Sequence, residues 1–199
     1  MLNSSPMARG LLAAMLATTL HGTALAAPTT THFDPAAQVA GTKLQLNGAG
    51  TRFKAIFKVY DMALYTPRKV GTPEELMALP GAKRLQFTAL RELPGTDLGR
   101  LFIRGMGDNA PRELIQKHAL SSTRLIEIFS GRSKLNPGDT FAMDFIPGKG
   151  TQFYIQGQAQ GEPVGDAEFF GMVLSIWFGA QPADRLLEQN LLGHEKEGN

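Results

Sequence analysis

The chain contains no cysteine among its 199 residues, and this absence excludes several kinds of chemistry at once. Without thiols the protein has no disulfide, no thiolate nucleophile and no cysteine-ligated metal. Histidine is scarce too: His118 is the only one of four that lies within the body of the chain, and no histidine or acidic residue stands near it at ligand spacing. We therefore expect no metal site and a fold held together by packing alone.

An excess of charge of one sign is also lacking, because 20 basic residues face 18 acidic ones. Nucleic-acid binding relies on a marked basic excess, so no nucleic-acid partner is expected. The sequence has no G-x-S-x-G or S-x-x-K motif of serine hydrolases. The glycines at 105 and 107 do not belong to a phosphate-binding loop or a dinucleotide fingerprint. We therefore expect no cofactor.

Long apolar runs are scarce, and the clearest one lies near the N-terminus. Arg9 precedes the apolar run 11–20, and Ala24-Leu25-Ala26 follows it. A basic residue, a short apolar run and a small-x-small site are the three parts of a cleavable secretory signal. The run is about half the roughly 20 residues that a membrane-spanning helix needs. We therefore predict a signal peptide at 1–26, export to the periplasm or the medium, and no membrane span after cleavage.

The rest of the chain suits one domain. Hydrophobic residues make up 43% of the sequence, which is enough for a sizeable core. Residues 27–40 lack periodicity and are predicted to be a flexible lead-in or a short edge strand. The domain itself is predicted at 41–193, and a polar tail at 194–199.

Strands and helices are both indicated along the domain. Strands with alternating apolar residues are predicted at 43–46, 51–66 (one long bent strand or a tight pair), 84–90, 140–146 and 152–156. The glycine-rich stretch 47–50 predicts a turn. Helices are predicted at 72–79, from Thr96, at 111–130, at 166–178 and from Pro182. The order of elements predicts an α+β fold, a mainly antiparallel sheet with helices on one face.

Three side chains are candidates for a binding site on residue type alone. Arg52 opens a strand, where its planar fork suits a carboxylate or a phenolate, although a surface arginine is the alternative. Trp177, the only tryptophan, lies on a predicted helix that is apolar nearly all round. Its side chain either lines a ligand cavity or anchors the core. Tyr60 and Tyr65 are five residues apart on a strand, so at most one faces a given cavity.

Three segments in this order resemble the chalcone isomerase superfamily. The first is LNGAGTRFK followed by FKVYDMALYTP, and the second is Leu90-Arg91-Glu92-Leu93 before the helix that starts near Thr96. The third, FFGMVLSIWFGAQPADRLLEQNLLG, is similar to the last block of the exported bacterial branch. The resemblance covers about residues 40–193. It implies an open-faced β-sandwich with a ligand cleft between the sheet and the helices.

The resemblance also implies where the groups of the plant enzymes would fall. Those enzymes cyclise chalcones to flavanones without a cofactor, and their arginine steadies the attacking phenolate. Arg52 matches that arginine, and the position of a strand threonine falls on Tyr60. The helix tyrosine falls on Leu98 or, with another gap placement, on Phe102.

At the two remaining polar positions of the plant enzymes, this sequence has other residues or allows two placements. The family asparagine falls on Gly105 or Asn109, in step with the two placements above, and a late threonine falls on Ile176 beside Trp177. Losing one donor to a developing oxyanion typically costs on the order of 100-fold or more in rate. An apolar cleft with one arginine suits an amphipathic acid better than a polyphenol.

These residues support three functional hypotheses. The first is a non-catalytic protein that binds a small apolar or amphipathic ligand, such as a fatty acid, as some relatives without activity do. Its ligand-binding residues would be Arg52, Tyr60, Leu98, Phe102, Ile176 and Trp177. The second is a cofactor-independent isomerase of chalcone isomerase type that relies on Arg52 and Tyr60. The third is an interaction module of the cell envelope without a small ligand.

Overall fold

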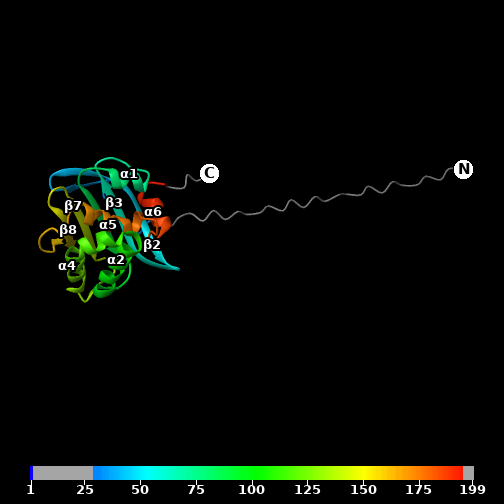
Figure 1. The fold of residues 1–199 in the computed structure, drawn as a ribbon. Coiled ribbons are helices and arrows are strands. Elements are labelled where there is room, and N and C mark those ends of the chain that lie inside the picture. Colours follow the sequence, from blue (N-terminus) through cyan, green and yellow to red (C-terminus); the bar gives the residue numbers. More distant parts are fainter. Residues whose placement is uncertain (2–28, 195–199) are drawn as a thin grey trace.

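A computed structural model describes Met1 and residues 29–194, so the predicted signal peptide lies outside the described residues except for Met1. Seven antiparallel strands form one sheet in the order β1-β2-β3-β4-β7-β8-β9 (Figure 1). They are β1 Ala36–Val39, β2 Thr42–Lys54, β3 Phe57–Thr66, β4 Lys83–Ala89, β7 Thr140–Ile146, β8 Gly150–Ile155 and β9 Gln158–Ala159. The edge strand β1 also approaches β4 and β7, so the sheet is curled.

Helices cover one face of this sheet. They are α1 Pro73–Ala78, α2 Gly95–Asn109, α3 Arg112–Lys117, α4 Ala119–Ser130, α5 Ala167–Phe178 and α6 Arg185–Leu191. Figure 1 shows α2, α4 and α5 together in front of the strands, with α6 beside β2. The short strands β5 Leu93–Pro94 and β6 Lys134–Leu135 form a separate pair. The predicted α+β fold with an antiparallel sheet and helices on one face is confirmed.

The predicted turn at 47–50 is wrong, because β2 runs straight through these residues. The glycines serve a long-range contact instead. A Cβ atom on Gly48 would overlap the backbone carbonyl of Asn190, and one on Gly50 would lie 2.9 Å from the Asn190 Cβ. The absent side chains therefore let α6 lie directly on the strand. The chain turns later, at Ala55 and Ile56, so the segment 51–66 is a tight pair rather than one bent strand.

Three helices also differ from the prediction, and one of them is α6, which begins at Arg185 with Asp184 as N-cap rather than at Pro182. The helix α2 begins at Gly95 with Pro94 as N-cap rather than at Thr96. Residues 111–130 form two helices, because His118 adopts φ −102° and ψ 23° between α3 and α4. By contrast, α1 and α5 lie where they are predicted, with Thr72 and Asp166 as their N-caps.

The two faces of β3 belong to two different cores. Tyr60, Met62 and Leu64 point to the helices and join the main core, whereas Ala63 and Tyr65 join a smaller core with residues of β1 and β2. The two tyrosines therefore lie on opposite faces, as their spacing predicts. On the second face, the backbone N–H of Thr31 donates to the buried carboxylate of Asp61 at 2.7 Å, which fixes the start of the described chain to the sheet.

Candidate functional site

Arg52 lies on the helix-facing side of the sheet, near the start of α6. It is the cross-strand partner of Tyr60, so the two side chains share a face. The next residue ties β2 to α6, because the N–H of Phe53 donates to the Asp184 carboxylate at 3.1 Å. Arg52 is half-buried, and its guanidinium forms no ion pair or hydrogen bond with any described residue. A half-buried cation of this kind is suited to an anionic partner.

Tyr60 presents its hydroxyl group beside this arginine. The indole N–H of Trp177 donates to the Tyr60 oxygen at 2.8 Å. Burial raises the pKa of Tyr60 to about 12, although the positive charge of Arg52 acts in the opposite direction. The phenol is therefore protonated at neutral pH. Its own O–H finds no acceptor among the described residues, so Tyr60 has one hydrogen bond left to donate.

The other predicted site residues lie in the same main core as Tyr60. Leu98 and Phe102 enter this core from α2, and Ile176 and Trp177 enter it from α5. The ring of Trp177 lies 5.9 Å from that of Phe102 and 5.3 Å from that of Phe87 on β4. All four predicted residues are almost completely buried. The structure therefore brings the predicted site together, but these side chains fill the space between sheet and helices.

The two alternative positions for the family asparagine have structural roles. A Cβ atom on Gly105 would lie 2.9 Å from Ile176 Cγ2, so this glycine lets α2 pack closely on α5. The amide nitrogen of Asn109 donates to the carbonyl groups of Gly105 and Gln181, at 2.9 and 3.0 Å. Its amide oxygen accepts from the Gln181 N–H at 2.7 Å. The amide of Asn109 thus joins the end of α2 to the loop after α5.

His118 has acidic neighbours that its sequence context does not reveal. Its Nε2 lies 3.3 Å from a carboxylate oxygen of Glu168 and 3.7 Å from one of Asp166. Both acids have other partners, since Lys117 pairs with Glu168 and Asp166 caps α5. The cluster ties the α3–α4 junction to the start of α5. About fifty residues separate His118 from Glu168, so only the fold brings them together.

A second arginine of the sheet, Arg84, shows what a fully paired guanidinium looks like in this fold. It lies on β4 and meets Asp144 of β7 through two hydrogen bonds of 2.6 Å. Asp144 is almost completely buried, and Arg84 is partly exposed. Neither residue points to the helices, because β4 alternates and places its neighbours Lys83 and Leu85 on that side. Within the described residues, Arg84 is therefore satisfied where Arg52 is not.

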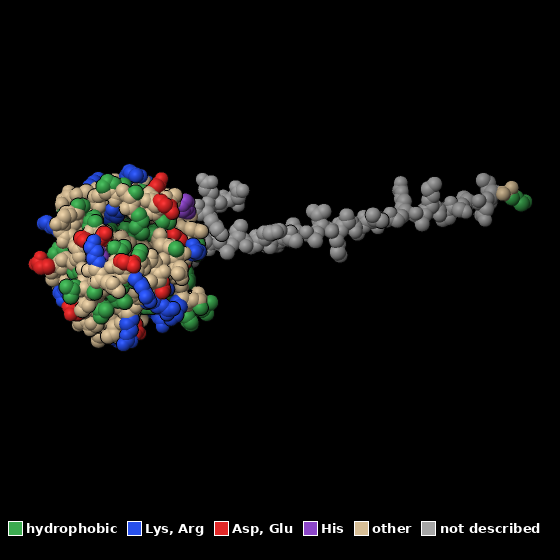
Figure 2. All heavy atoms as spheres, viewed as in Figure 1, with side chains coloured by type: hydrophobic (Ala, Val, Ile, Leu, Met, Phe, Trp, Pro, Cys, Tyr) green, Lys and Arg blue, Asp and Glu red, His purple; other side chains and the backbone are tan. Residues whose placement is uncertain are grey.

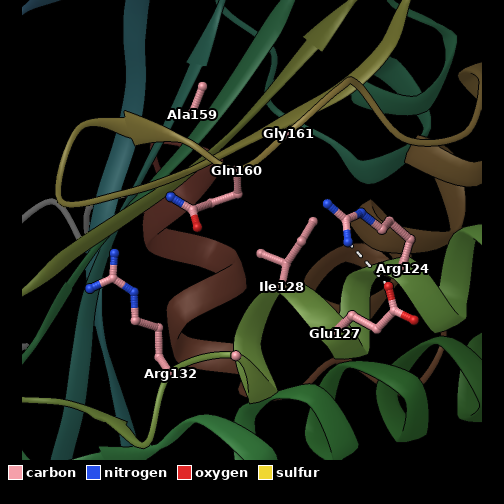
Figure 3. A pocket seen from close by; sticks show the side chains of 8 residues that line it. Arg124, Glu127, Ile128, Arg132, Ala159, Gln160 and Gly161 are labelled. Carbon is pink, nitrogen blue, oxygen red and sulfur yellow. Dashed lines mark hydrogen bonds and ion pairs between the residues drawn. The ribbon is translucent and has the colours of Figure 1, made fainter.

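Two pockets open outside the predicted cleft. One, of about 270 Å³, lies between the end of α4 and the loop after β9 (Figure 3). Its rim carries Arg124, which pairs with Glu127 at 3.1 Å, and Arg132, and its floor includes Ile128. The other, of about 380 Å³, lies between residues 29–33 and the face of β2 that carries Leu46 and Ala49. Neither pocket includes Arg52 or Tyr60.

A family profile described as chalcone isomerase-like matches residues 27–193. The chain belongs to the chalcone isomerase-like family. The predicted resemblance is thereby confirmed. No curated protein sequence matches this chalcone isomerase-like chain.

Solved structures include a neighbour of similar fold. A fatty-acid binding protein of Arabidopsis thaliana superimposes with a TM-score of 0.62 at 15% sequence identity. The match covers 82% of the chalcone isomerase-like chain and 92% of the plant protein. At this identity the likeness establishes the shared fold. Among the described helices of the chalcone isomerase-like chain, none has both the length and the apolar character needed to cross a bilayer.

Proposed function

We propose that this protein binds an amphipathic acid, such as a fatty acid, without catalysing a reaction on it. The observation that carries the proposal is the pair formed by Arg52 and Tyr60. Among the described residues Arg52 lacks an acidic partner, and the Tyr60 hydroxyl still has a proton to donate. A carboxylate placed between the two groups accepts hydrogen bonds from both.

The apolar part of such a ligand has a suitable environment next to this pair. Leu98, Phe102 and Ile176 belong to the same main core as Tyr60 and offer hydrocarbon surface only. Because these side chains are closely packed, binding requires α2 and α5 to move apart. Met106 and Met172 belong to the same core, and methionine adapts to new packing more easily than branched residues do. The fatty-acid binding protein of similar fold supports this choice of ligand.

The absence of suitably placed polar groups supports a role without catalysis. Apart from Arg52 and Tyr60, the positions implied by the plant enzymes carry apolar side chains, glycine, or an Asn109 amide bound to backbone. An enolate formed during cyclisation would then lack most of the donors that stabilise it. We therefore assign the site to binding.

We further propose that the protein is exported to the periplasm or the medium. Arg9, the apolar run 11–20 and the Ala24-Leu25-Ala26 site support this location. The family match begins at residue 27, directly after the proposed cleavage site. An exported binding protein of this kind would meet lipids and other envelope molecules.

Extraction and titration test the binding function together. The purified protein is extracted with organic solvent, and co-purified small molecules are identified by mass spectrometry. Affinity for oleate is then measured by calorimetry for the wild type, Arg52→Ala and Arg100→Ala. Loss of a charge-assisted hydrogen bond should weaken binding by roughly 10- to 100-fold in Arg52→Ala. Arg100 is the control, because it lies on the exposed side of α2 and pairs only with Asp97.

A second candidate function is an interaction module of the cell envelope. The closely packed core is the observation that favours it, since the described side chains fill the place of the expected cleft. The same experiment separates the two candidates. Extraction that yields no ligand, together with an oleate affinity that Arg52→Ala leaves unchanged, would reject fatty-acid binding and leave the interaction module.

A further inference from the structure

The turn between β2 and β3 exposes two adjacent large apolar side chains. Ile56 is 84% exposed and Phe57 is 59% exposed. We call residues 54–58 the hairpin tip. Figure 1 shows this hairpin projecting from the lower right of the domain, and Figure 2 shows hydrophobic side chains gathered at that projection. Single exposed apolar residues are common on protein surfaces, but an adjacent pair on a projecting turn is not.

Basic side chains surround this apolar pair. Lys54 and Lys58 flank it in sequence, and Arg91 lies over the Phe57 ring, 5.8 Å from its centroid. In Figure 2 a group of Lys and Arg side chains lies next to the projecting hydrophobic ones. The hairpin tip thus combines an apolar point with a positive rim.

Acidic groups near the tip do not offset this positive charge. Glu92, which follows Arg91, pairs with Lys134 at 2.5 Å. Asp184 accepts hydrogen bonds from Phe53 and from the first N–H groups of α6. The cations of the tip therefore remain available to an external anion.

The turn that carries the apolar pair is tight. Ala55 has φ +53°, in the left-handed region that alanine rarely adopts. A glycine or asparagine would fit this position better. Ala40 and Gln156 adopt the same conformation in the turns β1–β2 and β8–β9, so the tip is an ordinary tight hairpin turn that differs from these in its exposed apolar pair.

We propose that the hairpin tip docks on an anionic lipid bilayer, with Ile56 and Phe57 entering the interface and the basic rim contacting lipid phosphates. Burial of apolar side chains together with attraction to anionic headgroups is how peripheral proteins bind membranes. A protein partner fits less well, because two side chains bury on the order of 300 Å², well below the roughly 800 Å² per partner of a stable interface. Membrane docking by the tip does not depend on the proposed ligand site. Oleate titration of Arg52→Ala tests the ligand site without vesicles, so the two proposals can fail separately.

Vesicle flotation tests the docking directly. The protein is mixed with vesicles of phosphatidylglycerol and phosphatidylcholine, or of phosphatidylcholine alone, and the bound fraction is measured. We expect binding to the anionic vesicles, and a loss of about tenfold or more in the double variant Ile56→Ser/Phe57→Ser. The double variant Lys54→Gln/Lys58→Gln should lose roughly fivefold per lysine, and high salt should act likewise. Leu120→Ser is the matched control, because Leu120 is 88% exposed on α4 rather than on the tip.

A site-specific probe removes any contribution from the N-terminal residues. Because the chain has no cysteine, Ile56→Cys and Leu120→Cys each carry a single thiol for a polarity-sensitive dye. The dye at 56 should shift to shorter wavelength on anionic vesicles, and the dye at 120 should not. Binding unaffected by the serine variant, or a dye at 56 that stays in water, would overturn the proposal. So would a wild-type dimer in sedimentation that Ile56→Ser/Phe57→Ser converts to monomer, because the tip would then contact a second copy.

Discussion

Arg52 and Arg84 lie in the same sheet, yet their surroundings differ in kind. Arg84 meets the buried Asp144 through two short hydrogen bonds on the face away from the helices. Arg52 faces the helices beside Tyr60 and forms no ion pair with a described residue. The first arginine is satisfied by the fold and so is expected to stabilise it. The second carries a partly desolvated charge that no described residue compensates. This arrangement is expected of a group that binds a ligand.

The largest effect should follow from breaking the satisfied pair. Asp144→Ala leaves Arg84 without its partner in a largely buried place, and removal of one member of such a pair costs about 3 to 5 kcal/mol. Urea unfolding should show this loss. Asp97→Ala is the control: its pair with Arg100 is exposed, and its loss should cost less than about 1 kcal/mol. Equal effects of the two substitutions would show that the Arg84 pair is not structural.

A smaller effect should appear at alkaline pH through Tyr60. The pKa of this phenol is raised to about 12 in the folded protein, from 10.0 in the unfolded chain. Its contribution to stability is therefore complete below pH 10 and is lost as the pH rises toward 12, by about 2 kcal/mol. Urea unfolding of the wild type and Tyr60→Phe at pH 9 and pH 11.5 should reveal the difference. If the free energy of unfolding changed equally with pH in the wild type and in Tyr60→Phe, the burial of the phenol would be contradicted.

Replacement of Arg52 should have the smallest effect on stability. Because its guanidinium has no described partner, Arg52→Met should change the free energy of unfolding by no more than about 0.5 kcal/mol. Arg84→Met should cost several times more, since it leaves the Asp144 carboxylate unpaired. Thermal and urea unfolding measure both. A large loss of stability in Arg52→Met would show that Arg52 stabilises the fold, as Arg84 does.

No effect at all is expected in an isomerase assay. The site lacks most of the donors that would stabilise an enolate, so a 2′-hydroxychalcone should lose its visible absorbance no faster than in buffer. Turnover above the blank that disappears in Arg52→Ala would contradict this expectation. It would make Arg52 a catalytic residue and support the isomerase hypothesis.

Local sequence patterns predicted much of the fold, because the physical causes there are local. Thr72 and Asp166 cap helices through their own side chains, and the alternation along β3 places Tyr60 and Tyr65 on opposite faces. The helix α5 is buried on nearly every side, as its apolar composition indicates. Such features depend on residues a few positions apart.

Distant contacts account for the errors. The glycines at 48 and 50 predict a turn by their local pattern, but they make room for a helix that lies about 140 residues later in the chain. The acidic neighbour of His118 is also distant in sequence, since Glu168 comes from another element. The structure places Arg52 opposite Tyr60 and puts Tyr60, Leu98, Phe102, Ile176 and Trp177 in one core, while their role in binding stays a prediction. The sequence could not show that the side chains of Leu98, Phe102, Ile176 and Trp177 fill the space between α2, α5 and the sheet.

The contact between α6 and β2 also has a consequence for the order of folding. Asn47 donates to the carbonyl of Leu191 at 2.8 Å, so a strand near the start of the domain is completed by a helix near its end. Contacts between residues so far apart in sequence form slowly, because a long loop must close first. The domain therefore stays unfinished throughout its synthesis. Under the proposed export, this topology would keep the chain unfolded for longer before it crosses a membrane.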